Sequence, residues 1–272
     1  MPRFNCSVMG LAILLLGLAF AGRNQAPGEQ AVPIVDITNR CLLGGAAGGM
    51  WVKPEVMAKQ LKGGEKYGLY SLTGFISNGA GSEPLSAGPP CAETYVVKIG
   101  PAPQGKKVAV AVGGQLSALP RTVTVLSSSS AMYRQVVSDD LKAHGITAKA
   151  APLNQVLKAD LDGDGLDEVL LSASRYAGGL GPNSKAGDYS IVLLRKIING
   201  KVETIPIVSE YHRAKGNFDA PSQYLIGSVL DLNRDGKMEI IIYGKYYEGE
   251  WAAVYSLDGN KIKEVLKCGC GS

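Results

Sequence analysis

The sequence is poor in aromatic residues, in histidine and in net charge, and its composition excludes several classes of protein. Aromatic residues make up 7% of the 272 residues, and only two residues are histidine. The 28 lysines and arginines nearly balance 24 aspartates and glutamates, which leaves a formal charge of +4. Such a chain has no basic stripe for nucleic acid. The composition also excludes a coiled coil, a collagen and a multi-span membrane protein.

Glycine, by contrast, is abundant. The chain has 35 glycines in 272 residues, or about 13% against a typical ~7%. Hydrophobic residues reach 46%, which is enough for a sizeable core. Many turns and short elements follow from this composition. We expect a mainly β protein, α+β overall, with little helix.

Residues 1–21 have the pattern of a secretory signal peptide. A positive charge near the start precedes an uninterrupted apolar and glycine run over residues 8–20, and residues 19–21 (Ala-Phe-Ala) form a small-x-small cleavage pattern. The alternative is a membrane anchor, but this run is shorter than the ~20 residues that span a bilayer. We therefore expect cleavage before Gly22, a secreted or extracytoplasmic protein without a stable membrane anchor, and a flexible lead-in over residues 22–33.

Cleavage would remove Cys6 and leave Cys41, Cys91, Cys268 and Cys270. Four cysteines in an exported protein permit up to two disulfides, in any of three connectivities. Cys268 and Cys270 are too close in sequence for an ordinary bridge to each other. We expect either that Cys41 pairs with Cys91, or that the C-terminal pair is tied back to the N-terminal region. A zinc site at the C-terminal pair is disfavoured, because the usual spacing is C-x₂₋₄-C.

Residues 34–150 form a mixed α+β region. Proline at the start and glycine past the end favour a short helix over residues 54–62, and apolar spacing favours another over residues 131–144. Strands are expected over residues 67–73, 94–99, 107–112 and 121–126. Glycine- and proline-rich loops are expected over residues 44–49 and 77–90.

From about residue 151 the sequence repeats itself. QVLKADLDGDGLDEVLLSAS at 155–174 aligns with IGSVLDLNRDGKMEIIIYGK at 226–245, an offset of 71 residues. Each copy has an apolar strand, an acidic loop and a second strand, followed by a hairpin that turns at Asn199-Gly200 or at Asp258-Gly259. Residues 151–272 are therefore predicted to form a β domain of two repeats, each a four-stranded antiparallel sheet that resembles a propeller blade.

The acidic loops, named here loop one (residues 160–168) and loop two (residues 231–239), have the spacing of a calcium site. Oxygen-bearing side chains stand at positions 1, 3, 5 and 9, glycine at position 6 permits a sharp turn, and position 7 offers a backbone carbonyl. Carboxylates gathered so closely repel one another unless a cation lies between them. The expected Ca²⁺ ligands are Asp160, Asp162, Asp164, Leu166 and Glu168 in loop one, and Asp231, Asn233, Asp235, Lys237 and Glu239 in loop two. Loop one, with more carboxylates, is expected to bind more tightly.

An EF-hand does not fit these loops, since its twelfth position should be glutamate and the chain has Leu171 and Ile242 there. The motifs D-x-D-G-D-G-x-x-E and D-x-N-x-D-G-x-x-E resemble the calcium loops of FG-GAP and VCBS-type repeats, which occur in integrin-like β-propellers. The resemblance covers about residues 151–267 and implies that the side chains at positions 1, 3, 5 and 9 bind the metal. No Phe-Gly precedes either loop, and a closed propeller takes four to eight blades.

The chain shows no recognisable nucleophile motif around its two histidines, His144 and His212. We expect a calcium-stabilised extracellular module that binds a protein or a glycan, or has a structural role, without catalysis. The alternative is a secreted hydrolase whose calcium is structural. Trp51, Trp251 and Tyr246-Tyr247 are candidates for a glycan-binding surface, although such side chains more often pack in a core.

Overall fold

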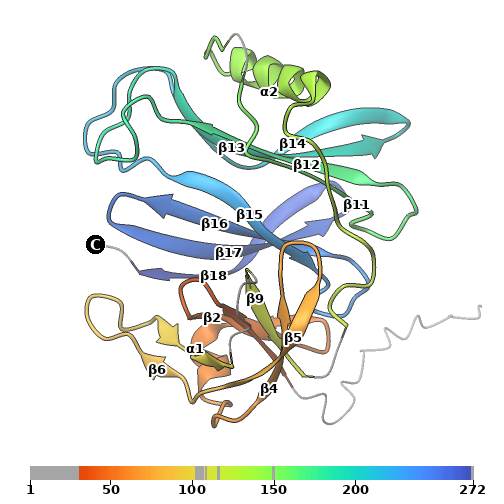
Figure 1. The fold of residues 1–272 in the computed structure, drawn as a ribbon, viewed down its shortest axis with the longest axis vertical. Helices are drawn as coiled ribbons and strands as arrows, with labels where there is room; N and C mark the ends of the chain where they lie inside the picture. Colours follow the sequence, from red (N-terminus) through yellow and green to blue (C-terminus); the bar gives the residue numbers. More distant parts are fainter. Residues whose placement is uncertain (1–30, 102–106, 108, 115–116, 149–150, 271–272) are drawn as a thin grey trace, which may run out of the picture.

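The computed structural model describes residues 31–101, 107, 109–114, 117–148 and 151–270. In these residues three antiparallel sheets and two helices are stacked in layers, with helix α2 (Ala131–Ala143) above the second sheet, the third sheet below it and the first sheet last (Figure 1). The expected fold class, mainly β with antiparallel sheets, is confirmed. The predicted signal peptide, Cys6 and residues 22–30 of the lead-in lie outside the described residues. No helix within the described ranges is long and apolar enough to cross a membrane.

The first sheet is curled and is built from the N-terminal region. Its strands are β1 (Val32–Asp36), β2 (Cys41–Ala47), β3 (Met50–Val52), β4 (Lys66–Tyr70), β5 (Phe75–Gly81), β6 (Leu85–Ser86), β7 (Tyr95–Val96), β8 (Ile99–Gly100) and β9 (Val110–Gly113). They lie in the order β6-β7-β2-β1-β9-β4-β5-β8, with β3 paired to β2. Helix α1 (Pro54–Ala58) buries Met57 and is shorter than the predicted helix over residues 54–62.

The loop predicted over residues 44–49 is wrong, because β2 runs on to Ala47. Gly45 lies so close to its neighbours that an added Cβ would be 2.5 Å from the Val32 carbonyl oxygen and 2.7 Å from Met57 Sδ. Glycine at this position therefore lets β1 and α1 approach β2, rather than forming a turn.

Two further boundaries in this region differ from the prediction. The lead-in expected over residues 22–33 ends earlier, because Val32 and Pro33 are buried in β1. The loop expected over residues 77–90 contains most of β5 and all of β6. Strand β5 pairs with β4 through residues such as Asn78, Gly79 and Ala80. Its small and polar side chains hide the alternation by which a strand is recognised in a sequence.

The second and third sheets are the two predicted repeats. The second sheet consists of β10 (Thr124–Val125), β11 (Gln155–Ala159), β12 (Glu168–Arg175), β13 (Asp188–Ile198) and β14 (Lys201–His212), paired in that order. The third sheet consists of β15 (Gln223–Leu230), β16 (Glu239–Tyr246), β17 (Gly249–Asp258) and β18 (Lys261–Cys270), again in order. Each repeat is thus an up-and-down unit of four strands, and β10 joins the second sheet from before residue 151.

The hairpins that close the repeats turn differently. Asn199 and Gly200 both have positive φ, at 52° and 74°, as a type I′ turn requires. The second hairpin pairs Asp258 with Lys261, so its loop is Gly259-Asn260. The predicted turn at Asp258-Gly259 was therefore one residue too early.

Apolar side chains join the layers in sequence. The second and third sheets meet through a cluster that includes Leu170, Val192, Ile240, Ile242 and Ala253. The third and first sheets meet through Ile34, Leu43, Val254 and Leu266, among others. Helix α2 buries Val137 and Leu141 against Leu171, Ile191 and Leu193 of the second sheet. The third sheet is therefore covered on both faces, which accounts for the continuous apolar run Ile240–Ile242 in β16.

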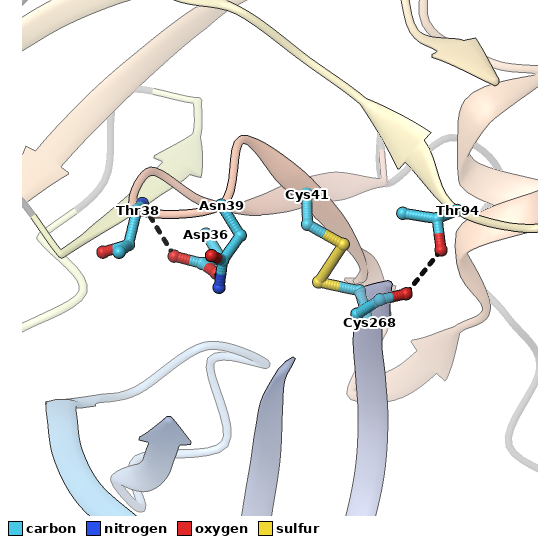
Figure 2. The surroundings of a disulfide bond; sticks show 7 residues. Asp36, Thr38, Asn39, Cys41, Thr94 and Cys268 are labelled. Atoms are coloured by element: carbon cyan, nitrogen blue, oxygen red, sulfur yellow. Dashed lines mark hydrogen bonds between the residues drawn. A yellow bond between two sulfur atoms is a disulfide. The ribbon is translucent and has the colours of Figure 1, made fainter. Parts of the chain in front are cut away.

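Two disulfides tie strand β18 to the first-sheet region, and Figure 2 shows the one between Cys41 and Cys268. Cys268 bonds to Cys41 of β2, with Cα atoms 6.1 Å apart, and Cys270 bonds to Cys91, with Cα atoms 5.6 Å apart. The pairing of Cys41 with Cys91 was wrong, and the alternative, a C-terminal pair tied back to the N-terminal region, is confirmed. Residues two apart in a strand face the same side, so both cysteines of β18 reach partners there. Two disulfides are typical of an oxidising compartment.

Candidate metal centre

The two acidic loops occupy equivalent places in the two repeats and lie against each other. Loop one joins β11 to β12, and loop two joins β15 to β16. The backbone amide of Met238, in loop two, donates to the carbonyl oxygen of Leu161, in loop one, at 2.7 Å. The stacking of the second sheet on the third therefore brings the two loops side by side.

The equivalence of the loops extends to individual hydrogen bonds. The glutamate at position 9 accepts from the amide at position 2, at 2.8 Å in Leu161–Glu168 and 2.8 Å in Leu232–Glu239. The aspartate at position 5 accepts from the amide at position 7, at 2.8 Å in both loops. The aspartate at position 1 accepts from the glycine amide at position 6, at 3.2 Å in loop one and 3.1 Å in loop two. The repeat read in the sequence is thus also a repeat of loop geometry.

Loop one gathers three of its predicted ligands. Oxygen atoms of Asp160, Asp162 and Glu168 lie within 4.8 Å of one another. Oδ1 of Asp162 is buried and has no hydrogen-bond partner among the described residues. This acidic cluster could therefore hold a metal ion. Asp164 is not part of the cluster, because its Oδ1 turns to the amide of Leu166.

A lysine from the neighbouring strand enters this cluster. Lys196 of β13 places Nζ 2.6 Å from Oδ2 of Asp162 and 2.8 Å from Oε1 of Glu168, and its side chain is only 6% exposed. Burial lowers the pKa of Lys196, but its hydrogen bonds to the two carboxylates outweigh this and raise it. Burial opposes ionisation of Asp162, yet the bond and the charge of Lys196 lower its pKa. The ammonium therefore stays charged in the cluster.

Loop two has no such lysine at the equivalent position. Extending the strand registers by one residue places Lys196 opposite Glu168, and Ser256 opposite Glu239. Glu239 is 2% exposed, and burial raises its pKa to about 8, with the negative charges of Asp235 and Asp231 adding to the effect. Oδ1 of Asp231 is buried without a hydrogen-bond partner in the described part of the chain. Within that part, the loop-two carboxylates do not converge as those of loop one do.

Arg121 connects the two loops from outside. Its Nε donates to the Asp160 carbonyl at 2.5 Å, and its Nη2 donates to the carbonyls of Leu161 at 3.1 Å and Gly236 at 2.8 Å. The guanidinium also lies 3.7 Å from Oδ2 of Asp160. One cation therefore fixes the backbone of both loops.

Sequence reasoning missed both Lys196 and Arg121. The one signal for Lys196 is a pair of basic residues, Arg195 and Lys196, inside the apolar strand YSIVLLRKII. Lys196 is buried although lysine is rarely buried unless it is paired. Arg121 has no sequence signal, because its partners are backbone carbonyls that lie 39 to 115 residues further along the chain.

The aromatic candidates for a glycan surface do not form one group. Trp51 packs against the core between the first and third sheets. Trp251 and Tyr246 line a pocket of 380 Å³ together with Glu55, Glu93 and Glu250, among others, and Lys267 Nζ lies 4.6 Å from the centre of the Trp251 ring. Tyr247 is 39% exposed and is not part of the lining. The structure thus brings two of the four side chains to one hollow.

A serine, an aspartate and a histidine also meet, between the long loop after β12 and the segment after β14. Ser184 Oγ donates to Oδ2 of Asp219, and His212 Nδ1 lies 3.2 Å from the same oxygen. The carboxylate thus stands between serine and histidine, whereas nucleophile activation needs the histidine next to the serine. Ser184 is also 1% exposed. This group holds two loops together rather than activating a nucleophile.

A comparison with protein-family models, curated proteins and solved structures finds no match for this chain. The kind of metal ion that the loops could bind therefore follows from their ligand atoms. Carboxylates, an amide side chain and backbone carbonyls are hard oxygen ligands, which suit hard cations such as Ca²⁺, Mg²⁺ or Mn²⁺ better than metals that prefer sulfur or imidazole.

Proposed function

We propose that this protein is a secreted calcium-binding module whose C-terminal repeats are of the FG-GAP/VCBS type and are stabilised by Ca²⁺ at the acidic loops. The observation that supports it is the matched pair of loops, each closed by a glutamate that is 2% exposed. Both loops also keep a buried, unpartnered aspartate oxygen, on Asp162 and on Asp231. Burying an ionised carboxylate is costly unless a cation or hydrogen bonds compensate, and a metal ion satisfies several such oxygens at once.

The role we assign to calcium is structural. The loops connect the first two strands of each repeat, and Glu168 and Glu239 are the first residues of β12 and β16. A cation bound there would fix the entry of each second strand and the contact between the stacked sheets. When bound, Ca²⁺ supplies charge compensation only, and the chain supplies the oxygen ligands and the fixed loop geometry.

We also propose that the module acts outside the cytoplasm and binds a protein or a glycan without catalysis. The two disulfides and the predicted signal peptide support export. The 380 Å³ pocket with Trp251 and Tyr246 supports binding, because its volume and its aromatic lining fall within the range of ligand sites.

Thermal melting tests the calcium proposal. The mature chain with its disulfides intact should melt several degrees higher in about 10 mM Ca²⁺ than in chelator, because a ligand at ~100 times a Kd of ~10⁻⁴ M stabilises by about 2.7 kcal/mol. Mg²⁺ at the same concentration is the control and should do less, since it demands octahedral geometry and dehydrates reluctantly. Melting curves that coincide in calcium and chelator, with no heat of calcium binding by calorimetry, would show that the loops are merely acidic turns.

A further inference from the structure

The two loops differ in the residue that lies opposite the glutamate at position 9 on the neighbouring strand. This residue is Lys196 in loop one and Ser256 in loop two. We propose that the Lys196 ammonium is the permanent cation of loop one, so that Ca²⁺ binds loop two and loop one keeps its shape without metal. This inference rests on the proposed function, because it assigns the calcium of the module to one of its two loops.

Lys196 engages the oxygens that a metal in loop one would need. Its Nζ contacts Asp162 at position 3 and Glu168 at position 9, two of the predicted ligands. Calcium bound at ~2.3–2.6 Å from the same oxygens would lie beside a fixed positive charge. The lysine side chain is only 6% exposed, so the fold encloses most of it. The ammonium therefore competes directly with the metal.

Among the described residues, no lysine contacts Glu239 of loop two as Lys196 contacts Glu168 of loop one. Ser256 stands where Lys196 stands in the other repeat. Glu239 is buried, and its carboxylate accepts a hydrogen bond from the amide of Leu232 at 2.8 Å. Two carboxylates of loop one, on Asp162 and Glu168, contact Nζ, whereas those of loop two do not converge within the described residues. This is the arrangement expected of a site in which the compensating cation is exchangeable.

The assignment reverses the ranking that the sequence suggests. Loop one has four carboxylates against three in loop two, so counting ligands favours loop one. Two of those four, on Asp162 and Glu168, are already paired with Lys196. Loop two keeps its three carboxylates and the Asn233 amide for the metal.

A reciprocal swap of the two residues tests the proposal. Calcium titrations by calorimetry on the disulfide-intact protein should give one site for the wild type, two for Lys196→Ser and none for Ser256→Lys. Lys196→Ser should also melt lower than the wild type in chelator, because it leaves Asp162 and Glu168 buried without a cation, and calcium should restore most of the loss.

Two milder variants keep the test decisive if Ser256→Lys does not fold. Asp235→Asn should weaken the calcium site at least tenfold, whereas Asp162→Asn, which changes a predicted ligand of loop one that contacts Lys196, should leave the affinity within about twofold. Two equal sites in the wild type, or a single site that Asp162→Asn removes, would overturn the assignment to loop two while leaving the calcium function intact. Absence of binding in both the wild type and Lys196→Ser would instead overturn the proposed function itself.

Discussion

Arg121 is the side chain at which the two acidic loops meet, and its donors go to backbone carbonyls of both. A charged donor to a carbonyl contributes more than a neutral one, typically ~1.5–3 kcal/mol when buried. The Arg121 side chain is 24% exposed, so water reduces this contribution. The loops are thus fixed to each other by a bridge that does not depend on any metal.

Replacing this bridge should lower stability even in chelator. Arg121→Ala is expected to cost about 1–2 kcal/mol, or several degrees in Tm, because three carbonyl oxygens lose a charged donor. Arg134→Ala is the matched control, since the Arg134 Nε donates to one carbonyl, that of Ser128, at 3.3 Å in an exposed hydrogen bond. Denaturant unfolding checks the difference, and equal midpoints for the two variants would contradict the bridging role.

At the residue scale, the sequence predicts which carboxylates lie close together better than it predicts the side chains that contact them. The spacing of Asp160, Asp162 and Glu168 was enough to bring them to one cluster, because loop geometry is local. Lys196 enters that cluster from a different strand, through cross-strand pairing of β12 with β13. This contact can be predicted only when the register of β12 against β13 is known. The acidic motif does not specify that register.

At the scale of elements, glycine was the main source of error. In loop two and in the hairpins, glycine marks turns with positive φ, as predicted. In β2 the same residue type marks close approach between strands, which a composition-based loop prediction does not distinguish. Gly45 is a clear example, because an added Cβ would meet the Val32 carbonyl oxygen at 2.5 Å.

The two roles of glycine are separable by substitution. Gly45→Ala should destabilise the protein by about 1–3 kcal/mol, because β1 or α1 must move to admit a methyl group. Gly74→Ala is the control, since its added Cβ would meet nothing within 4 Å and its φ is not positive. Thermal melting of both variants checks the prediction. A Gly45→Ala protein as stable as Gly74→Ala would show that the space beside Gly45 accepts a methyl group without strain.

For the whole molecule, the repeat predicted two sheets but not their stacking. The internal pattern of each four-stranded unit is local, since each strand pairs with the next one along the chain. The first sheet is different, because β9 pairs with both β1 and β4, far from it in the chain. No hydrophobic period specifies such pairings, nor which sheet faces which. The disulfides from β18 to the first-sheet region link the third sheet covalently to the first.

The two disulfides should contribute unequally, although they constrain the unfolded chain almost equally. They span 227 and 179 residues, so removing either one leaves the other to close a loop of similar size, and the two chain-entropy costs differ by only about 0.2 kcal/mol. Their surroundings differ more. Cys41 and Cys268 are 2% and 8% exposed within the core between the first and third sheets, whereas Cys270 is exposed.

We therefore expect Cys41→Ala/Cys268→Ala to be less stable than Cys91→Ala/Cys270→Ala by about 1–3 kcal/mol, because only the first pair leaves a cavity in the core. Denaturant unfolding under nonreducing conditions measures this difference directly. Equal stabilities would mean that the bridges act through the unfolded chain alone and that the core tolerates the lost sulfurs. Removing all four cysteines should cost more than the worse double variant, since the first sheet is then held to the third by noncovalent contacts alone, such as the packing of Ile34 on Val254 and the hydrogen bond from Thr94 to the Gly269 carbonyl.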